Sequence, residues 1–411
     1  MHVSSRSSVR LRCRPVRVAF LTLQYPPHGV GGIGSYVQAV ATALAAAGHD
    51  VTVVCAARGQ TRSTVVEDGV TVVRRGVIGP VRLWERFVLP RQTARVRVHH
   101  ALSGAWALLR TGQRFDVVEA PEWKAQGLLL RALRRGRVVV HVHLPLELEQ
   151  AWNGAVPSRG QRASHRLEHA TARLAHARTS TSRQTIRRPD GSTWLPERAV
   201  TVVAPPLDLG RWSGCPPVSA TSDPTVLCVG RLERRKAPEL LVAALGRLVD
   251  DVPGLRVVFV GGVKTVDGRP YDEVVAELAE QAGVPCDVLP PTADPDEVRG
   301  HYEAARVVAV PSRFETLSMV AFEALACGRP AVVTDAVGAA EWVGSALPEL
   351  VVPAGDDAAL AAALRPHLLD ARHACAVGER GRHLVAEVCA PERVVADRIA
   401  VYEAVAGGPR G

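Results

Sequence analysis

Two glutamates, Glu315 and Glu323, lie eight positions apart in the stretch "PSRFETLSMVAFEALACGRP", residues 311–330. Glu323 falls within an apolar run with three-and-four spacing, which predicts an amphipathic helix packed on a core. Glu315 precedes that run, and the backbone amides of residues 316–318 would be free donors for an anion at the start of the helix. Carboxylates at such positions usually cap a helix or face solvent. On this stretch alone, the capping interpretation is favoured over a binding site.

Two other loops combine residue types that bind phosphate. The loop "HGVGGIGSYV" follows a strand-like run and opens a helix, so Gly31 and Gly32 would let backbone amides approach an anion. The loop "GRLERRKAP" brings Arg231 and Lys236 to the next helix start, and a forked guanidinium with a point-charge ammonium suits a diphosphate. Each loop is weak evidence alone. A nicotinamide site is disfavoured, because "CAARGQ" replaces the ribose-binding acid expected after the second strand.

The elements that must position these residues follow an alternating pattern. The chain has 411 residues, which predicts two domains rather than one core. Apolar runs such as "DVTVVCA" and "RVVVHVHL" predict buried parallel strands, and alanine-rich runs such as "GSYVQAVATALAAAGH" predict helices between them. The pattern pauses at 202–224, a segment rich in proline, serine and glycine, and then restarts with "TVLCVGRL". We expect an α/β protein with two doubly wound, Rossmann-like domains that face each other across a cleft.

The net charge of +9 admits several kinds of partner. Aromatic residues make up only 4% of the chain and no known nucleic-acid motif is present, so we expect no nucleic acid. The stretch 82–100, "RLWERFVLPRQTARVRVHH", mixes arginines with apolar residues. It predicts a weak contact with an anionic membrane surface or, more commonly, a solvated helix face.

The cysteines and the N-terminus indicate a reduced, cytoplasmic protein. The eight cysteines show no C-x-x-C or Cys/His pairing, and Cys55 and Cys228 sit in strand-like runs, so we expect core thiols without zinc or disulfides. No apolar run reaches the length of about 18 residues that a membrane span needs. The arginine-rich start is followed by an apolar run too short for a signal peptide.

The motifs together carry a family resemblance. "GRLERRK" followed by "PSRFETLSMVAFEALACGRPAVV" resembles the retaining glycosyltransferases of family four, whose fold is GT-B, and Glu315 and Glu323 match the E-x7-E motif of that family. The "GGIGSYV" loop, "DVVEAPEW", "VVVHVHLP" and "PPLDLGRW" match in kind and order, so the resemblance covers nearly the whole chain. It implies a metal-independent hexosyltransferase that uses a nucleotide sugar, most commonly a UDP-sugar, as co-substrate and has no other cofactor.

The resemblance also implies roles for single residues. In the family, the glutamate that corresponds to Glu323 binds the ribose hydroxyls, and the one that corresponds to Glu315 lies beside the donor sugar. By the same resemblance, Arg231 and Lys236 would neutralise the diphosphate. His143 matches a histidine near the acceptor and the donor sugar, although His141, two residues earlier on the same strand face, is an alternative. The catalytic candidates are thus His143 and Glu315. The candidates for donor binding are Gly31, Gly32, Arg231, Lys236, Thr316, Leu317, Ser318 and Glu323.

Thr316, Leu317 and Ser318 depart from the glycines that the family often has after the first glutamate. This leaves the donor sugar open between glucose and N-acetylglucosamine, among others.

Four carboxylates follow the predicted strands of the first domain: Glu119 and Glu122 in "EAPEW", and Glu147 and Glu149 in "LPLELEQ". They suggest that Glu119, Glu122 and Glu147 bind a cationic hydroxylated acceptor such as an aminocyclitol, in an aminoglycoside-type antibiotic pathway. Capping or solvated acids are the simpler alternative. Two other functions stay open: a peripheral-membrane transferase with a lipid or cell-envelope acceptor, and a non-catalytic sugar-nucleotide-binding protein.

The expected domain organisation follows from these assignments. Closure about the linker would assemble the site and exclude water. The segments are a disordered N-terminus at 1–15, an acceptor-binding domain at 16–201, a linker at 202–224, a nucleotide-sugar-binding domain at 225–390, and a helix at 391–411 that crosses back to the first domain.

Overall fold

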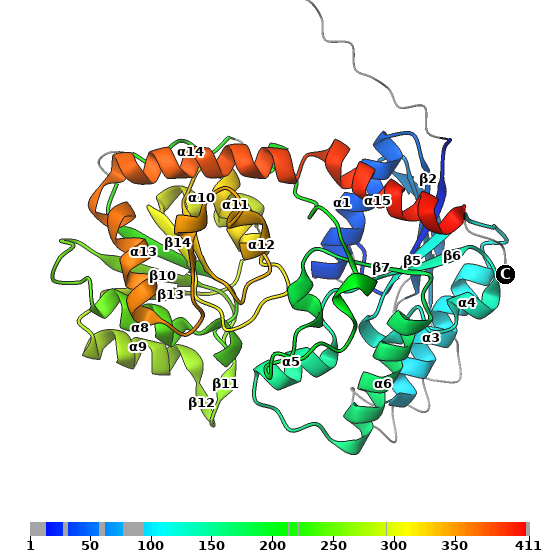
Figure 1. Cartoon of the computed structure of the whole chain (residues 1–411), viewed down its shortest axis with the longest axis horizontal. Helices are drawn as coiled ribbons and strands as arrows, with labels where there is room; N and C mark the ends of the chain where they lie inside the picture. The colour runs from blue at the N-terminus through cyan, green and yellow to red at the C-terminus, as the bar shows by residue number, and fades with distance from the viewer. Residues whose placement is uncertain are drawn as a thin grey trace, which may run out of the picture.

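The computed structural model shows two α/β domains, each built on a mostly parallel sheet flanked by helices (Figure 1). No helix in the described ranges has the length and apolarity that crossing a bilayer requires. The structure describes residues 14–27, 32–56, 62–76, 94–212, 214–219, 222–292 and 294–407.

The first domain contains a sheet of eight described strands in the order β3-β4-β2-β1-β5-β6-β7-β8. All neighbours are parallel except β3 and β4, which pair antiparallel at one edge. The strands are β1 Arg17–Thr22, β2 Asp50–Ala56, β3 Ser63–Glu67, β4 Val70–Arg75, β5 Val117–Pro121, β6 Arg137–His141, β7 Ala177–Ser180 and β8 Thr201–Val202. The described α-helices between them are α1 Gly32–Ala46, α3 Ala94–Leu109, α4 Leu130–Leu133, α5 Leu146–Trp152 and α6 Arg159–Leu174.

The second domain contains a sheet of six described strands in the order β13-β10-β9-β14-β15-β16, with parallel pairs throughout. The strands are β9 Thr225–Val229, β10 Arg256–Val260, β13 Cys286–Leu289, β14 Val307–Val310, β15 Ala331–Thr334 and β16 Val351–Val352. A short hairpin, β11 Thr265–Val266 and β12 Arg269–Pro270, lies outside this sheet. The helices are α8 Pro238–Gly246, α9 Tyr271–Gln281, α10 Pro295–Ala304, α11 Met319–Ala326, α12 Ala340–Val343 and α13 Asp357–Leu369.

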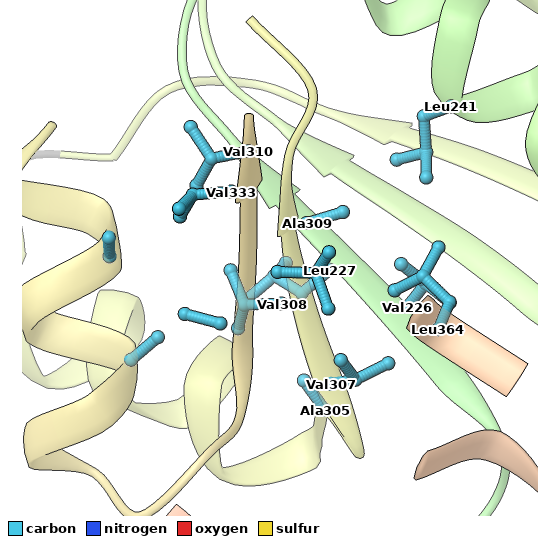
Figure 2. Close-up of a cluster of buried hydrophobic side chains, with 14 of the residues drawn as sticks. Val226, Leu227, Leu241, Ala305, Val307, Val308, Ala309, Val310, Val333 and Leu364 are labelled. Atoms are coloured by element: carbon cyan, nitrogen blue, oxygen red, sulfur yellow. The ribbon is translucent and has the colours of Figure 1, made fainter. Parts of the chain in front are cut away.

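The central strands of both sheets are covered on both faces, which explains their continuous apolar sequences. Figure 2 shows the core of the second domain, where Leu227 of β9, Val308 of β14 and Val333 of β15 lie in one buried cluster with Leu364 of α13. This packing fixes the ends of β9 and β14, from which the loops with the candidate phosphate ligands emerge.

Two long helices close the chain: α14, Ala371–Val388, and α15, Pro391–Ala406. They run along one edge of the molecule, with α14 on the second domain and α15 on the first (Figure 1). Tyr402 of α15 is fully buried in the core of the first domain. Between the sheets, residues 203–224 include the short helix α7, Leu209–Trp212, whose Trp212 packs into the second core.

Candidate functional site

A pocket at the C-terminal ends of β9 and β14 contains the central ion pair of the site. The ammonium of Lys236 lies 2.7 Å from Oε1 of Glu315, and Ser312 donates a hydrogen bond to the same oxygen at 2.7 Å. Gly230, Arg231 and other residues of the two loops line this pocket with them. The structure thus brings together three residues that the sequence predicted from separate motifs: Arg231, Lys236 and Glu315.

Glu315 is only 6% exposed, so its charge depends on its neighbours. Burial by itself would raise the pKa of its carboxyl, but Lys236 and then Arg235 hold the pKa below its ordinary value. The carboxylate is therefore ionised at neutral pH, with its negative charge directed at the lysine.

The pocket depends on a close backbone approach below the lysine. Gly261, at the end of β10, has a φ of +158°, and a Cβ there would lie 2.0 Å from the carbonyl oxygen of Gly230. A residue with a side chain cannot fit at Gly261 without moving the β9 loop. This glycine lets the Arg231–Lys236 segment fold over the end of the sheet.

The loop from Phe314 to Ser318 contacts both domains. The ring of Phe314 stacks on Trp152 of the first domain at a centroid distance of 5.0 Å, and the carbonyl oxygen of Thr316 accepts a hydrogen bond from Ser182. Ser318, the N-cap of α11, has a φ of +74°, a strained value for a residue with a side chain. Observed strain of this kind is typical of binding loops.

The backbone amides of Thr316, Leu317 and Ser318 donate no hydrogen bond to the described residues. They lie at the start of α11, as the sequence predicted, and they remain available to a ligand. The hydroxyl of Ser318 is also buried without a partner in the part of the chain that the structure describes.

Glu323 lies on α11, one turn into the helix, and is half-buried. Its Oε2 accepts a hydrogen bond from the hydroxyl of Tyr302 at 2.7 Å, whereas Oε1 has no partner among the described residues. Burial raises the pKa of Glu323, and the Tyr302 hydrogen bond and the charge of Arg211 oppose that rise. The tyrosine holds the carboxylate in place and leaves one oxygen for a hydroxyl group.

Arg231 and Arg235, both in the loop after β9, differ in exposure and in role. Arg231 is half-exposed and lies 3.4 Å from Glu233. Arg235 is buried, donates to the carbonyl oxygen of Phe314 at 2.8 Å and pairs with Glu233 at 2.7 Å. Arg235 therefore ties the β9 loop to the Glu315 loop, and Arg231 keeps its guanidinium accessible to an anion.

The first domain presents a group of rings at the end of β6. Tyr36 of α1 stacks on His141 at 4.2 Å and meets His143 edge-on at 4.8 Å. His141 is 2% exposed and its Nδ1 lies 2.9 Å from the hydroxyl of Thr179. The ring of His143 has no hydrogen bond to the described residues. These contacts favour His143 over His141 as the residue that meets a ligand.

Burial and the nearby charge of Arg398 lower the pKa of His143 to about 3. The imidazole is therefore neutral at physiological pH and can accept or donate a hydrogen bond according to its tautomer.

The acceptor role predicted for Glu119 and Glu122 is wrong in this structure, because both side chains are buried and satisfied. Glu119 is 2% exposed and accepts hydrogen bonds from Tyr36 at 3.2 Å and Tyr402 at 2.6 Å. Glu122 is fully buried and accepts from the amides of His143 and Leu144. Both carboxylates therefore have structural roles inside the first domain and are not exposed to a ligand.

Glu147 is partly exposed but already paired with two basic side chains. It lies 2.7 Å from Arg188 and 2.7 Å from His169, and these partners lower its pKa to about 2 despite partial burial. Its neighbour Glu149 is half-buried, and its carboxylate has no partner among the described residues. The predicted cationic acceptor thus loses most of its support.

The glycine loop before α1 is described only in part. Gly31 lies outside the described residues, whereas Gly32 begins α1, and an added Cβ there would meet no described atom within 4 Å. Most of the 82–100 stretch is also outside them, although residues 94–100 form the start of α3.

Several residues of the site have no signal in the sequence. Ser312, Arg235 and Tyr302 support the two glutamates from loops and helices of the second domain. Ser312 and Arg235 lie within the two motifs of the second domain, but the residues to which those motifs point are Glu315, Arg231 and Lys236.

The two α/β domains, with their parallel sheets and flanking helices, have the architecture of the GT-B fold. Solved structures agree: sucrose-phosphate synthase from Thermosynechococcus elongatus has a TM-score of 0.70 at 23% identity and aligns over 95% of this chain and 99% of its own. Anabaena HepE in complex with UDP has a TM-score of 0.67 at 16% identity, over 94% and 100%. At these identities the likeness shows the fold.

The chain belongs to glycosyltransferase family four. The profile described as "Glycosyltransferase Family 4" matches residues 30–211, and "Glycosyl transferases group 1" matches residues 216–384. D-inositol 3-phosphate glycosyltransferase of Kineococcus radiotolerans is 32% identical over 89% of this chain and 90% of its own. The protein of the same description from Geodermatophilus obscurus is 31% identical over 98% and 91%.

Proposed function

We propose that this glycosyltransferase moves a hexosyl group, with retention of configuration, from a UDP-sugar to a hydroxyl of a small cyclitol-type acceptor. The observation that carries the proposal is the Lys236–Glu315 pair, because it places a partly buried cation and a buried carboxylate in one pocket. A nucleotide sugar has complementary groups: an anionic diphosphate and, next to it, a sugar with hydroxyl donors.

The proposed donor site places positive charge beside the diphosphate, where the bond between the sugar and the leaving group breaks. Arg231 and Lys236 stabilise the diphosphate as it leaves, with the amides of residues 316–318 as additional donors. Glu315 accepts from the sugar hydroxyls, and Glu323, held by Tyr302, accepts from the ribose. With two protein cations at the leaving group, a dedicated metal ion is unnecessary.

The proposed acceptor is a polyol without the positive charge first expected. Burial of Glu119 and Glu122 removes the reason for an ammonium group. The similar proteins are described as acting on D-inositol 3-phosphate, which is a phosphorylated cyclitol. The neutral imidazole of His143, without a hydrogen bond to the described residues, is the proposed contact to the acceptor and the donor sugar.

Product analysis tests the proposal. The protein is incubated with UDP-glucose or UDP-N-acetylglucosamine and, separately, D-inositol 3-phosphate, 2-deoxystreptamine or a membrane-lipid extract. Mass spectrometry should detect a hexosylated cyclitol. NMR should show that the sugar in the product keeps the anomeric configuration it had in the donor. Addition of EDTA should leave the transfer rate unchanged. A hexosylated lipid or a hexosylated amine instead would mean that the proposed cyclitol is not the acceptor. Donor binding without any product would favour a sugar-nucleotide-binding protein.

A further inference from the structure

Helix α3, Ala94–Leu109, has an unusual outer face. Four of its large apolar residues are exposed: Val98 at 43%, Leu102 at 48%, Trp106 at 37% and Leu109 at 39%. Their spacing of four, four and three residues places them on one side of the helix. We call these four residues the α3 ridge.

The α3 ridge exposes apolar residues where an ordinary surface helix exposes charged ones. A helix packed on a sheet normally turns charged residues to the solvent. On α3, the opposite face packs against β2 and η1, Trp123–Ala125, with alanines and Leu108 but also with the buried Arg97 and His99, and the helix contains no acidic residue at all. From Val96 to Leu109, every exposed residue belongs to the ridge. A continuous exposed apolar face of this kind marks an interaction site.

The charges beside the ridge are positive. The guanidinium of Arg110 lies 5.6 Å from the centre of the Trp106 ring, at the C-terminal end of the ridge. Burial and then the nearby charges of Arg62 and Arg110 lower the pKa of Arg75. The nearby Glu67 does not offset them, because it is paired with Arg74.

We propose that the α3 ridge docks the first domain onto an anionic lipid surface. Apolar side chains, an indole ring and flanking arginines are the combination by which peripheral helices bind the headgroup region of such membranes. A second copy of this chain fits less well, since apposed ridges would bring like charges together in a protein of net charge +9. The proposal is independent of which acceptor the enzyme uses.

Vesicle co-sedimentation of the full chain tests the docking surface. The probes are vesicles of phosphatidylcholine alone and of phosphatidylcholine mixed with phosphatidylglycerol. The wild type should bind only the anionic vesicles, and added salt should weaken binding. Leu102→Asp should abolish binding, and Arg110→Glu should weaken it by about fivefold or more. Leu369→Asp, at a residue 46% exposed on α13 of the other domain, should bind like the wild type.

Three results would overturn the proposal. The first is no binding of the wild type to anionic vesicles. The second is binding that Leu102→Asp and Arg110→Glu leave unchanged. The third is a concentration-dependent dimer, seen by light scattering, that Leu102→Asp dissociates while vesicle binding is absent. Circular dichroism and donor turnover of each variant confirm that its fold is intact.

Discussion

Lys236 and Glu315 lie on loops from two adjacent strands, β9 and β14, and their charged atoms are 2.7 Å apart. Neither charge can be removed alone without cost, because Glu315 is almost fully buried. The pair therefore serves the fold as well as the donor site, and a variant at either position must be analysed for both.

Lys236→Met should be both less stable and inactive. It leaves the buried Glu315 without its closest cation, which costs about 3–5 kcal/mol in the free energy of unfolding. The double variant Lys236→Met with Glu315→Gln should recover part of that stability but none of the transfer activity. Urea unfolding and product formation measure the two effects. If the double variant is no more stable than the single one, the pair does not have this structural role.

The same pair gives the wild type an acid-dependent loss of stability. The pKa of Glu315 is below its ordinary value in the folded protein, so its stabilisation is present above the ordinary pKa and disappears as the pH falls through the folded value. In Lys236→Met, the charge of Arg235 and the hydrogen bond from Ser312 still oppose burial, so the acid-dependent loss of stability should become smaller than in the wild type. Thermal unfolding across the acid range compares the two pH dependences.

Glu122 should make the protein less stable as the pH rises toward 8. Burial raises its pKa to about 8, so the folded state keeps a proton that the unfolded chain loses near 4.5. Stability should fall by up to about 1.4 kcal/mol per pH unit between these values and then level off. Glu122→Gln should remove this slope in urea unfolding at the cost of about 1–3 kcal/mol. Glu149→Gln is the matched control and should keep the wild-type slope.

Substitutions of the two histidines, His141 in β6 and His143 after it, should have different effects: one should lower activity and the other stability. His143→Ala should lower kcat/KM by about tenfold or more, with little change in stability, because its ring has no hydrogen bond to the described residues. His141→Ala should lower stability by about 1–3 kcal/mol, because it removes the bond to Thr179 and the stacking on Tyr36. Steady-state kinetics and urea unfolding of both variants measure these effects. If His141 were the residue that contacts the ligand, His141→Ala would lower kcat/KM more than His143→Ala.

Arg398→Met should release α15 from the first domain. Arg398 is 1% exposed, lies over the Tyr36 ring and donates to the carbonyl oxygen of Ala204, and its charge faces Glu119. Its loss leaves a buried carboxylate without a cation, at a cost of about 3–5 kcal/mol. Arg393→Met, on the same helix but 41% exposed, should change stability by less than about 1 kcal/mol. Equal effects of the two variants would contradict this role.

Much of the fold could be predicted because its strands are buried on both faces. The run "DVTVVCA" coincides with β2, and the run around Leu227 became β9. The edge hairpin of β3 and β4 was missed, since it pairs antiparallel and β3 is largely exposed. The short strands β7 and β16 carry too few residues for a pattern.

The site was predictable where its residues belong to recognisable motifs and not where they depend on distant partners. Glu315 and Lys236 come from separate motifs that were both assigned to the donor, and their charged atoms lie 2.7 Å apart. Glu119 was assigned to the acceptor because it belongs to a group of four carboxylates at neighbouring strand ends in a chain of net positive charge. Its actual partners, Tyr36 and Tyr402, are separated from it by 83 and 283 positions, and no local pattern reports such contacts.

The position of α15 has a consequence for the biosynthesis of the chain. Tyr402 and Arg398 of this helix complete the core that begins with β1 and α1. On the ribosome, the first domain to emerge thus lacks one of its own helices until residues 391–406 have been synthesised. Until then Glu119 has neither its arginine nor one of its tyrosines, so the domain synthesised first is the last to reach its native state. A truncation at the end of α14 should therefore damage the opposite half of the molecule more than the half in which it is made.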